Sequence, residues 1–446
     1  MASASPPSAP AGGASAGSLL RRRKLWVFPA ALSGLVALLL SLLYMGGILT
    51  PDGSLHRLPV ALVDADDGRP LPGERQNLGA QFSSAIVSSS PGDDVRWRRL
   101  TRAEAQDQLA AGKVYGALVV PPGFTDSVRA LAEGTAEKRP TLTVLTNPGM
   151  GSLGSALADQ ISERAAAEAS QELGRRLTES AGGDATPAQR LLLRDPVAVT
   201  TEVGHPIGSR SGLGLSAFYY TLLLVLAGFL AGNIIHNGVD TGLGYADSEL
   251  GPWHSRRPTV PVSRTSTLVV KMGMTAGLTV LTTALIMVAT IGILGMDAPH
   301  LPLLAVFSYC ASLAVGLGVQ AINAAFGGIG QLVAMFVFIA LALPSSGATV
   351  PLEAVPEFYR VLGIFEPMRQ LASGVRSILY FDARADAGLA RAWIMIAIGV
   401  AAALPSASPW LVTTTVRACT AWCRGRSEAP RALGYHAKSL ICPRHP

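Results

Sequence analysis

Long apolar segments separated by polar connections run along the chain, with lengths typical of bilayer-crossing helices. A hydrocarbon core about 30 Å thick requires about 20 apolar residues in a helix. Six such segments are Leu25–Leu49, Leu213–Ile235, Leu268–Leu294, Leu301–Ile322, Gly330–Leu343 and Trp393–Val412, of which the fifth has ragged edges. The pattern predicts a membrane α-helical protein with six transmembrane helices.

A polar segment, residues 50–212, separates the first two apolar segments and shows a different periodicity. Strands are predicted at Leu58–Asp64, Val95–Leu100, Val114–Val120, Thr141–Thr146 and Val197–Val203, and helices at Asn77–Val87, Ala103–Ala111, Thr125–Glu133 and Gly154–Ser180. Repeated βα units predict an α/β domain inserted between transmembrane helices 1 and 2. The last helix carries an apolar stripe that either packs on the sheet or binds a partner.

The two ends of the chain differ from these parts. Residues 1–24 are rich in Ala, Ser, Pro and Gly and end in Arg21–Lys24, which indicates a disordered basic leader. The following apolar segment is longer than the core of a cleaved signal peptide, so we expect a retained anchor. A five-helix transmembrane domain over residues 213–415 and a tail over 416–446 complete the expected organisation.

The charges predict which side of the membrane each part faces. The segment 51–212 holds 20 acidic and 17 basic residues, whereas the rest of the chain holds 10 and 19. Bases cluster before the first apolar segment, between the second and third, and after the sixth, which places both termini in the cytoplasm and the α/β domain outside. With 31 Arg against 5 Lys, a composition suited to a GC-rich bacterial genome, we expect a plasma-membrane protein.

The net charge of +6 does not indicate nucleic-acid binding, because the bases flank apolar segments instead of forming a stripe with aromatic residues. The α/β domain has no cysteine and therefore folds without disulfides. In the tail, Cys419 and Cys423 precede His436, Cys442 and His445, but the spacing matches no familiar zinc pattern. We expect neither a metal nor a cofactor.

Motifs of catalysis are missing. The sequence contains no G-x-x-x-x-G-K-[ST], so energy from ATP would have to come from another polypeptide. It contains no G-x-S-x-G and no H-E-x-x-H either, and we do not expect an enzyme. Gly149, Gly151 and Gly154 form a G-x-G-x-x-G between a strand and a helix, with Glu172 further on, but a Gly-rich turn explains these glycines as well.

Polar residues within the apolar segments are mostly amides. Asn233, Gln320 and Gln331, with Asn237 and Asn323 at the segment ends, either line a translocation path or hydrogen-bond between helices. The predicted segments contain no acidic residue, which disfavours proton-driven transport unless an acid such as Glu366 lies within the bilayer.

The connection between the second and third apolar segments resembles a known family. An acidic-Leu-Gly segment that includes Glu249 is followed by TVPVSRTSTLVVK from Thr259 to Lys271. This is similar to the cytoplasmic loop of type-2 ABC exporter permeases, which docks on the ATPase. The resemblance implies a coupling loop made by Glu249, Arg256, Arg257, Pro261, Ser263, Arg264 and Lys271. The same bases also suffice to hold the flanking helices in place.

Two further segments extend the likeness. Gly347–Ile378, with Glu366, Pro367 and Arg376, looks like the outward-facing helical hairpin of those permeases. VALVDAD from Val60 and GKVYGALVVPPGFTDSV from Gly112 resemble the extracytoplasmic domain of the YhgE/Pip subgroup, whose relatives of unassigned function include proteins linked to drug or mutagen resistance.

The resemblance implies a permease subunit of an ABC-type exporter, with a separate ATP-binding subunit, a homodimer or heterodimer of permeases, and membrane lipid as partners. The substrate would be an amphipathic or lipid-like compound or drug, and Glu366 would join the amides on the translocation path. The alternative is a non-transporting, membrane-anchored receptor or scaffold that binds a partner through the α/β domain.

Overall fold

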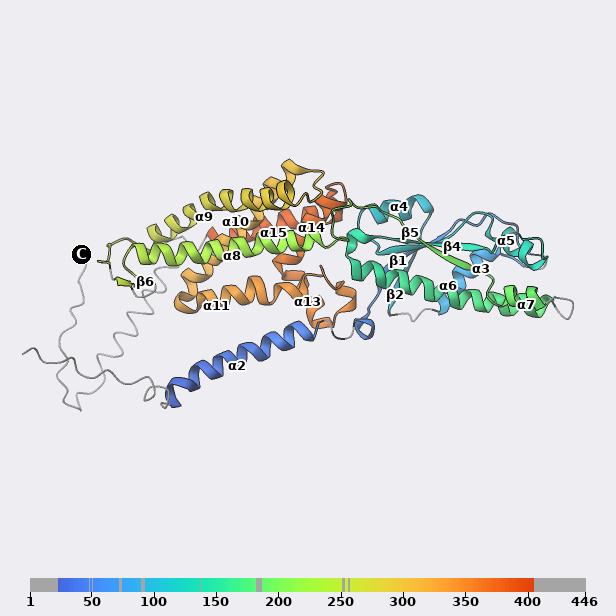
Figure 1. Ribbon diagram of the computed structural model, residues 1–446, viewed down its shortest axis with the longest axis horizontal. Helices are drawn as coiled ribbons and strands as arrows, with labels where there is room; N and C mark the ends of the chain where they lie inside the picture. The colour runs from blue at the N-terminus through green and yellow to red at the C-terminus, as the bar shows by residue number, and fades with distance from the viewer. Residues whose placement is uncertain are drawn as a thin grey trace, which may run out of the picture.

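The computed structural model describes residues 23–404 except 48, 50, 72–73, 90–92, 137, 182–186, 251–252 and 256. The α/β domain and a helical bundle lie end to end along the longest axis of the molecule (Figure 1). Three predicted features lie outside the described residues. They are Arg256 of the coupling loop, the basic leader up to Arg22 and the cysteines of the tail.

The α/β domain contains a five-stranded sheet in the order β2-β1-β3-β4-β5. Its strands are β1 (Leu58–Asp64), β2 (Val95–Arg99), β3 (Gly116–Val120), β4 (Thr141–Thr146) and β5 (Ala198–Val203). β1 runs parallel to β2 and β3, β4 runs parallel to β5, and the β3–β4 pair is antiparallel. All five predicted strands are confirmed, and the sheet is mixed.

Helices cover both faces of this sheet. They are α3 (Leu78–Ser89), α4 (Arg102–Ala110), α5 (Phe124–Ala132), α6 (Ser152–Ala181) and α7 (Pro187–Arg194). Alternation along β3 separates the two cores, because Leu118 contacts the cluster under α3, α5 and α6 whereas Ala117 and Val119 contact the cluster under α4. The apolar stripe of α6 packs into the domain core, with Ala165 and Ala169 buried.

The helical part follows β5. Its helices are α8 (Ser216–Gly242), α9 (Arg264–Met287) continued by the π-helix η3 (Val288–Ile293), α10 (Leu301–Phe326), α11 (Gly330–Met335) continued by the π-helix η5 (Phe336–Ala340) and by α12 (Ala342–Ser345), α13 (Glu357–Phe365), α14 (Pro367–Tyr380) and α15 (Leu389–Ala403). The apolar helix α2 (Arg23–Met45) precedes the α/β domain. Short elements are the 3-10 turns η1 (Asp52–Ser54), η2 (Pro148–Met150), η4 (Gly327–Ile329), η6 (Leu352–Ala354) and η7 (Ala385–Ala387), and the strand pair β6 (Ser248–Leu250) and β7 (Trp253–Ser255).

Three helical runs are long and apolar enough to cross a membrane: Ser216–Gly242, Arg264–Ile293 and Leu301–Ser345. They indicate a membrane protein, as the sequence predicts. The third run turns back on itself at Gly327, whose φ of +60° suits glycine, and Phe338 then packs against Gly318 of α10. Two shorter apolar helices, Ala30–Gly46 and Leu389–Ala403, overlap the first and sixth predicted segments, Leu25–Leu49 and Trp393–Val412, and residues 405–412 of the sixth lie outside the described residues.

Candidate functional site

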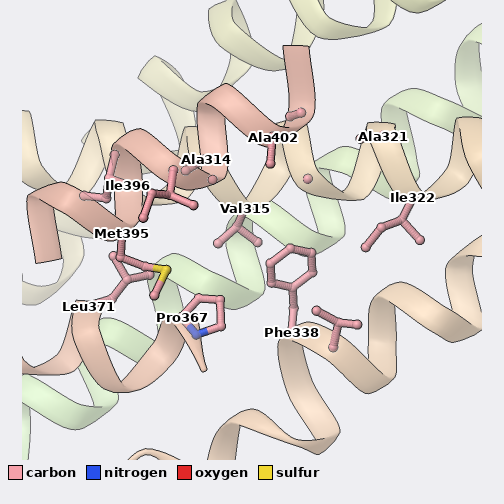
Figure 2. Close-up of a pocket in the computed structure, with 15 residues that line it drawn as sticks. Ala314, Val315, Ala321, Ile322, Phe338, Pro367, Leu371, Met395, Ile396 and Ala402 are labelled. Atoms are coloured by element: carbon pink, nitrogen blue, oxygen red, sulfur yellow. The ribbon is translucent and has the colours of Figure 1, made fainter. Parts of the chain in front are cut away.

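An apolar cavity of about 340 Å³ lies between helices of the bundle and opens at its surface, where the lining residue Ile398 is 56% exposed. Figure 2 shows side chains of α10, η5, α14 and α15 pointing into it. The 15 lining residues are all apolar: Ala314, Val315, Gly318, Ala321, Ile322, Val337, Phe338, Pro367, Leu371, Met395, Ile396, Ile398, Gly399, Ala402 and Ala403. Its size falls within the range of small-molecule sites, and its lining suits a hydrocarbon or aromatic group.

The cavity exists because small residues face it where helices would otherwise fill the space. Gly318 and Ala321 line it from α10, and Gly399 and Ala402 line it from α15. A side chain at Gly399 would meet only Ala314, at an ordinary contact distance of 3.7 Å. Larger residues at these positions would occupy the volume with side chains of the protein.

Only Glu366 separates the helices α13 and α14, and their junction borders this cavity through Pro367. Glu366 is the N-cap of α14, and its carboxylate accepts a hydrogen bond from the backbone N–H of Arg369 at 3.0 Å. The next residue, Pro367, occupies the first turn of α14 and lines the cavity (Figure 2). Glu366 is 4% exposed, so an acidic side chain is buried within the bundle at the junction of α13 and α14.

The predicted amides face a different side of α10, towards α8 and α9. The Asn323 amide donates to the side chain of Asn233 at 3.1 Å, and Gln331 donates to Asn237 at 3.1 Å. Gln320 donates to the carbonyl of Gly232 at 3.0 Å. The structure therefore brings these amides together as bonds between helices, and the described cavity lining includes none of them.

A stripe of hydroxyl side chains on α9 continues this polar contact. Thr275, Thr279 and Thr283 are buried one turn apart, and each donates a hydrogen bond to the backbone carbonyl four residues earlier. Threonine can satisfy its hydroxyl in this way within its own helix. Thr275 also accepts a hydrogen bond from the side-chain amide of Gln320 on α10, at 3.3 Å.

An ionic cluster closes the end of α8 and α9 that lies away from the α/β domain. The ammonium of Lys271 is 2.7 Å from a carboxylate oxygen of Asp240 and 3.0 Å from Nδ1 of His236, and the other ring nitrogen of His236 is 3.3 Å from Asp240. Lys271 is 5% exposed, so it is not available for docking a partner. Asp240 was not among the sequence candidates, although its spacing of four residues from His236 on one helix points to such a pair.

The remaining residues of the predicted coupling loop lie near the same end of the bundle. The backbone of Glu249 belongs to β6, whose position at the end away from the sheet is visible in Figure 1. Arg257, Pro261, Ser263 and Arg264 are exposed. Ser263 is the N-cap of α9 and accepts a hydrogen bond from the N–H of Ser266 at 3.1 Å, which fixes where the helix begins.

The glycines of the G-x-G-x-x-G make room for side chains of the protein. A Cβ at Gly149 would lie 2.9 Å from the ring of Phe381, and one at Gly154 would lie 2.5 Å from the ring of Tyr115. Gly151 has a φ of +101° and lies next to the guanidinium of Arg376. Close packing therefore explains the glycines without a bound dinucleotide.

Phe381, which follows the last residue of α14, packs against the α/β domain. Its ring is 2% exposed and lies against Gly112 and Gly149, with the ring of His205 at 5.6 Å. Tyr115 of the α/β domain donates to Glu353 at 2.9 Å. Burial of Tyr115, together with the nearby charge of Glu353, raises the pKa of its hydroxyl well above the ordinary value, so it remains a donor at neutral pH.

An exposed ionic network surrounds this contact. Lys113 pairs with Asp386 at 2.5 Å, and Arg384 pairs with Asp107 at 2.8 Å and with Asp386 at 3.1 Å. The hydrogen bonds from Lys113 and Arg384 lower the pKa of Asp386 to about 2. These pairs hold α4 to the loop before α15.

No group of His, Cys, Asp and Glu side chains that could hold a metal ion occurs within the described ranges of 23–404. Cys310 is a free thiol on α10. No curated protein and no solved structure matches the chain. A family model described as a protein of unknown function matches residues 30–399, which span α2, the α/β domain and most of the helical bundle. The chain therefore belongs to the DUF3533 family.

Proposed function

We propose that this protein is a permease subunit of an ABC-type exporter that moves an amphipathic or lipid-like compound out of the cell. The observation that carries the proposal is the wholly apolar cavity between α10, η5, α14 and α15. A pocket of this kind receives the hydrocarbon part of a ligand, because apolar surface leaves water or lipid headgroups when it enters.

In this proposal α2, α8, α9, α10, α11–α12 and α15 are the six spans, both termini are cytoplasmic and the α/β domain is outside the plasma membrane. Support comes from the bases that flank α2 and α9 and from the position of the α/β domain at one end of the bundle (Figure 1). The hairpin α13–α14 would then enter the membrane from the outside, between the fifth and sixth spans. The likeness to the YhgE/Pip subgroup is part of the same proposal.

Coupling to a separate ATPase is assigned to the loop from Glu249 to Arg264 at the opposite end. The exposed Arg257 and Arg264 lie there, beyond the buried pair Lys271–Asp240 that fixes α8 to α9. Force applied to this loop would reach the cavity through α9 and α10, which pack along their length (Figure 1). A second permease copy would complete the translocation path.

The competing hypothesis is a membrane-anchored receptor or scaffold that binds a partner through the α/β domain. The apolar stripe of α6 favoured it slightly in the sequence, but that stripe packs on the sheet, with Ala165 and Ala169 in the core. The receptor or scaffold stays the alternative, and the apolar cavity favours the permease.

The test reverses one exposed charge at the proposed coupling loop. Arg264→Glu should lower efflux of a lipophilic dye from expressing cells about tenfold, the effect of roughly 1.4 kcal/mol in a docking contact. Membrane insertion and thermal stability should not change, because Arg264 is exposed. Arg391→Glu, an equal charge reversal at the other end of the bundle, is the control. Normal efflux by the Arg264 variant, or failure of any ATPase to co-purify with the wild type, would contradict the proposal.

A further inference from the structure

Glu366 has a buried carboxyl group without an ion-pair partner among the described residues. It is the one acidic side chain that is buried in the part of the chain described by the structure. One carboxylate oxygen caps α14 by accepting from Arg369 N–H, and the other oxygen, Oε1, has no hydrogen-bond partner among the described residues. Only one of the two carboxylate oxygens therefore caps the helix.

Basic side chains close to Glu366 in the sequence make other contacts. The guanidinium of Arg369 donates to the carbonyl of Gly363 at 3.2 Å, and that of Arg376 donates to the carbonyl of Ala348 at 2.8 Å. Nη1 of Arg360 is buried without a hydrogen-bond partner. No ion pair involves Glu366 within the described ranges. A buried carboxylate without a counter-charge costs free energy, and a cation placed beside it removes that cost.

The cavity begins at the residue that follows Glu366. Pro367 lines the cavity whereas Glu366 is not among the lining residues, and consecutive Cα atoms are about 3.8 Å apart. Leu371, one turn further along α14, lines it as well (Figure 2). A cavity lined by apolar residues and a buried acid without an ion-pair partner are therefore neighbours at the start of α14.

We infer that the cavity takes the apolar part of an organic cation whose ammonium group pairs with the carboxylate of Glu366. This inference rests on the proposed function, since it names the substrate class of the same site. A quaternary or protonated amine that carries an alkyl or aryl group has both features. A neutral amphiphile would fill the cavity but leave the buried acid without a partner, and an anionic one would place a like charge beside it.

The test measures binding by isothermal titration to the full-length protein in lipid nanodiscs, with empty nanodiscs as the blank. The probes are decyltrimethylammonium, decanol and decyl sulfate, which share one alkyl chain and differ in the charge of the head. Glu366→Gln removes the charge but keeps an oxygen that accepts from Arg369, so the cap of α14 survives. Glu357→Gln, an exposed acid at the start of α13, is the matched control.

We expect the wild type and Glu357→Gln to bind the cation at least about tenfold more tightly than decanol, and decyl sulfate most weakly. In Glu366→Gln the ratio of cation to decanol affinity should fall to about one, with decanol affinity unchanged. Ala314→Phe, which fills the cavity from α10, should weaken cation and decanol alike. An unchanged preference in Glu366→Gln, or no preference in the wild type, overturns the inference.

Binding requires neither an ATPase nor transport, so the two proposals fail separately. If the protein prefers the cation but exports no dye, only the proposed function is contradicted. If it exports dye but binds all three probes equally, only the cation site is contradicted.

Discussion

Asp66 connects three segments of the α/β domain through a single carboxyl group. It accepts backbone N–H bonds from Gly68, Gly79 and Thr125 at 3.0–3.1 Å and a further bond from the Thr125 hydroxyl. It thereby joins the end of β1 to the starts of α3 and α5, whose N-terminal amides favour a negative charge. Partial burial raises the pKa of Asp66, but these hydrogen bonds outweigh burial, and the pKa is lowered overall.

Replacement of this carboxyl should unfold the α/β domain at lower urea concentration. Asp66→Asn loses the charge and places an amide N–H among donors, so we expect a loss of about 3 kcal/mol in the free energy of unfolding. Pulse proteolysis of the purified protein in urea measures it. Asp67→Asn is the control, because Asp67 accepts only one bond among those described, from Gly123 N–H at 2.9 Å, and should cost about 1 kcal/mol.

The lowered pKa of Asp66 also predicts how its contribution to stability changes with pH. The stability that Asp66 contributes is present above the ordinary value of 3.8 and is lost as pH falls through the lowered value. The wild type and Asp66→Asn should therefore differ at neutral pH and converge in strong acid. Equal stability of the Asp66 and Asp67 variants at pH 7 would show that the carboxyl does not join the three segments.

At the scale of elements, α8 packs against α10 through small residues. Gly228 and Gly232 of α8 are one turn apart, and Ser312 and Gly316 face them from α10. A Cβ at Gly228 would lie 2.5 Å from the carbonyl of Ser312, which is closer than any real contact. Close approach of backbones is the usual way in which apolar helices associate when both are surrounded by lipid.

A side chain at Gly228 should therefore push the two helices apart. We expect Gly228→Val to cost about 2 kcal/mol, as overpacking does elsewhere, and to lower the melting temperature measured by intrinsic fluorescence. Gly238→Val is a matched control on the same helix, because a Cβ at Gly238 would have no heavy atom of another residue within 4 Å outside its own stretch of helix. A melting temperature that falls equally in both variants would mean that helix propensity, and not the contact, decides the result.

Elements with strong periodicity were predictable from the sequence, and those without it were not. β1 and β4 have the predicted bounds, because the continuous apolar run of β1 ends at Asp64 and β4 ends at the turn around Pro148. The eight-residue α7 was missed because it is too short for a clear period. The π-helices η3 and η5 have no sequence signal that separates them from α-helix.

The candidate site was predictable only in part, because it combines distant residues. Glu366 and Pro367 drew attention as a pair, but the cavity beside them also needs the small residues of α10 and α15. The chain positions of Asn233 and Gln320 could not decide between a path and a bond between helices. In the described structure they bond to Asn323 and to the carbonyl of Gly232, on neighbouring helices, and their place on a translocation path stays a prediction.

At the scale of the whole molecule, the α/β domain and the bundle form one unit. Phe381 is buried in the α/β domain, and the hydroxyl of the adjacent Tyr380 lies 2.7 Å from Ser216 and accepts from the N–H of Ala217 at the start of α8. Two consecutive residues, Tyr380 and Phe381, therefore connect the first long helix of the bundle to the α/β domain. Contacts between residues more than 160 positions apart do not follow from local periodicity, so this junction was not predictable.

The ionic network around the junction predicts a dependence on pH. Hydrogen bonds from Lys113 and Arg384 lower the pKa of Asp386 from 3.8 to about 2, so its contribution to stability is present above 3.8 and is lost as pH falls through about 2. Asp386→Asn should lower the melting temperature by about 2 °C at neutral pH, because exposed ion pairs are weak. The difference from the wild type should shrink between pH 4 and pH 2.

Asp126→Asn provides the comparison for this network. Asp126 pairs with Arg129 inside α5, at 2.8 Å, and does not cross the junction. Both variants should be scanned in the same buffers by intrinsic fluorescence. A difference between wild type and Asp386→Asn that persists below pH 2 would rule out the carboxylate as its cause.

The helix α2 is attached to the rest of the molecule near its C-terminal end. Tyr359 donates to the carbonyls of Leu42 and Leu43, and Tyr44 donates to Ile339, whereas Leu32, Leu35 and Leu38 are exposed. Packing therefore fixes the position of one end of α2 but not its inclination. In a bilayer, hydrophobic mismatch sets the tilt of such a helix, so a thinner membrane would incline α2 further while the bundle kept its shape.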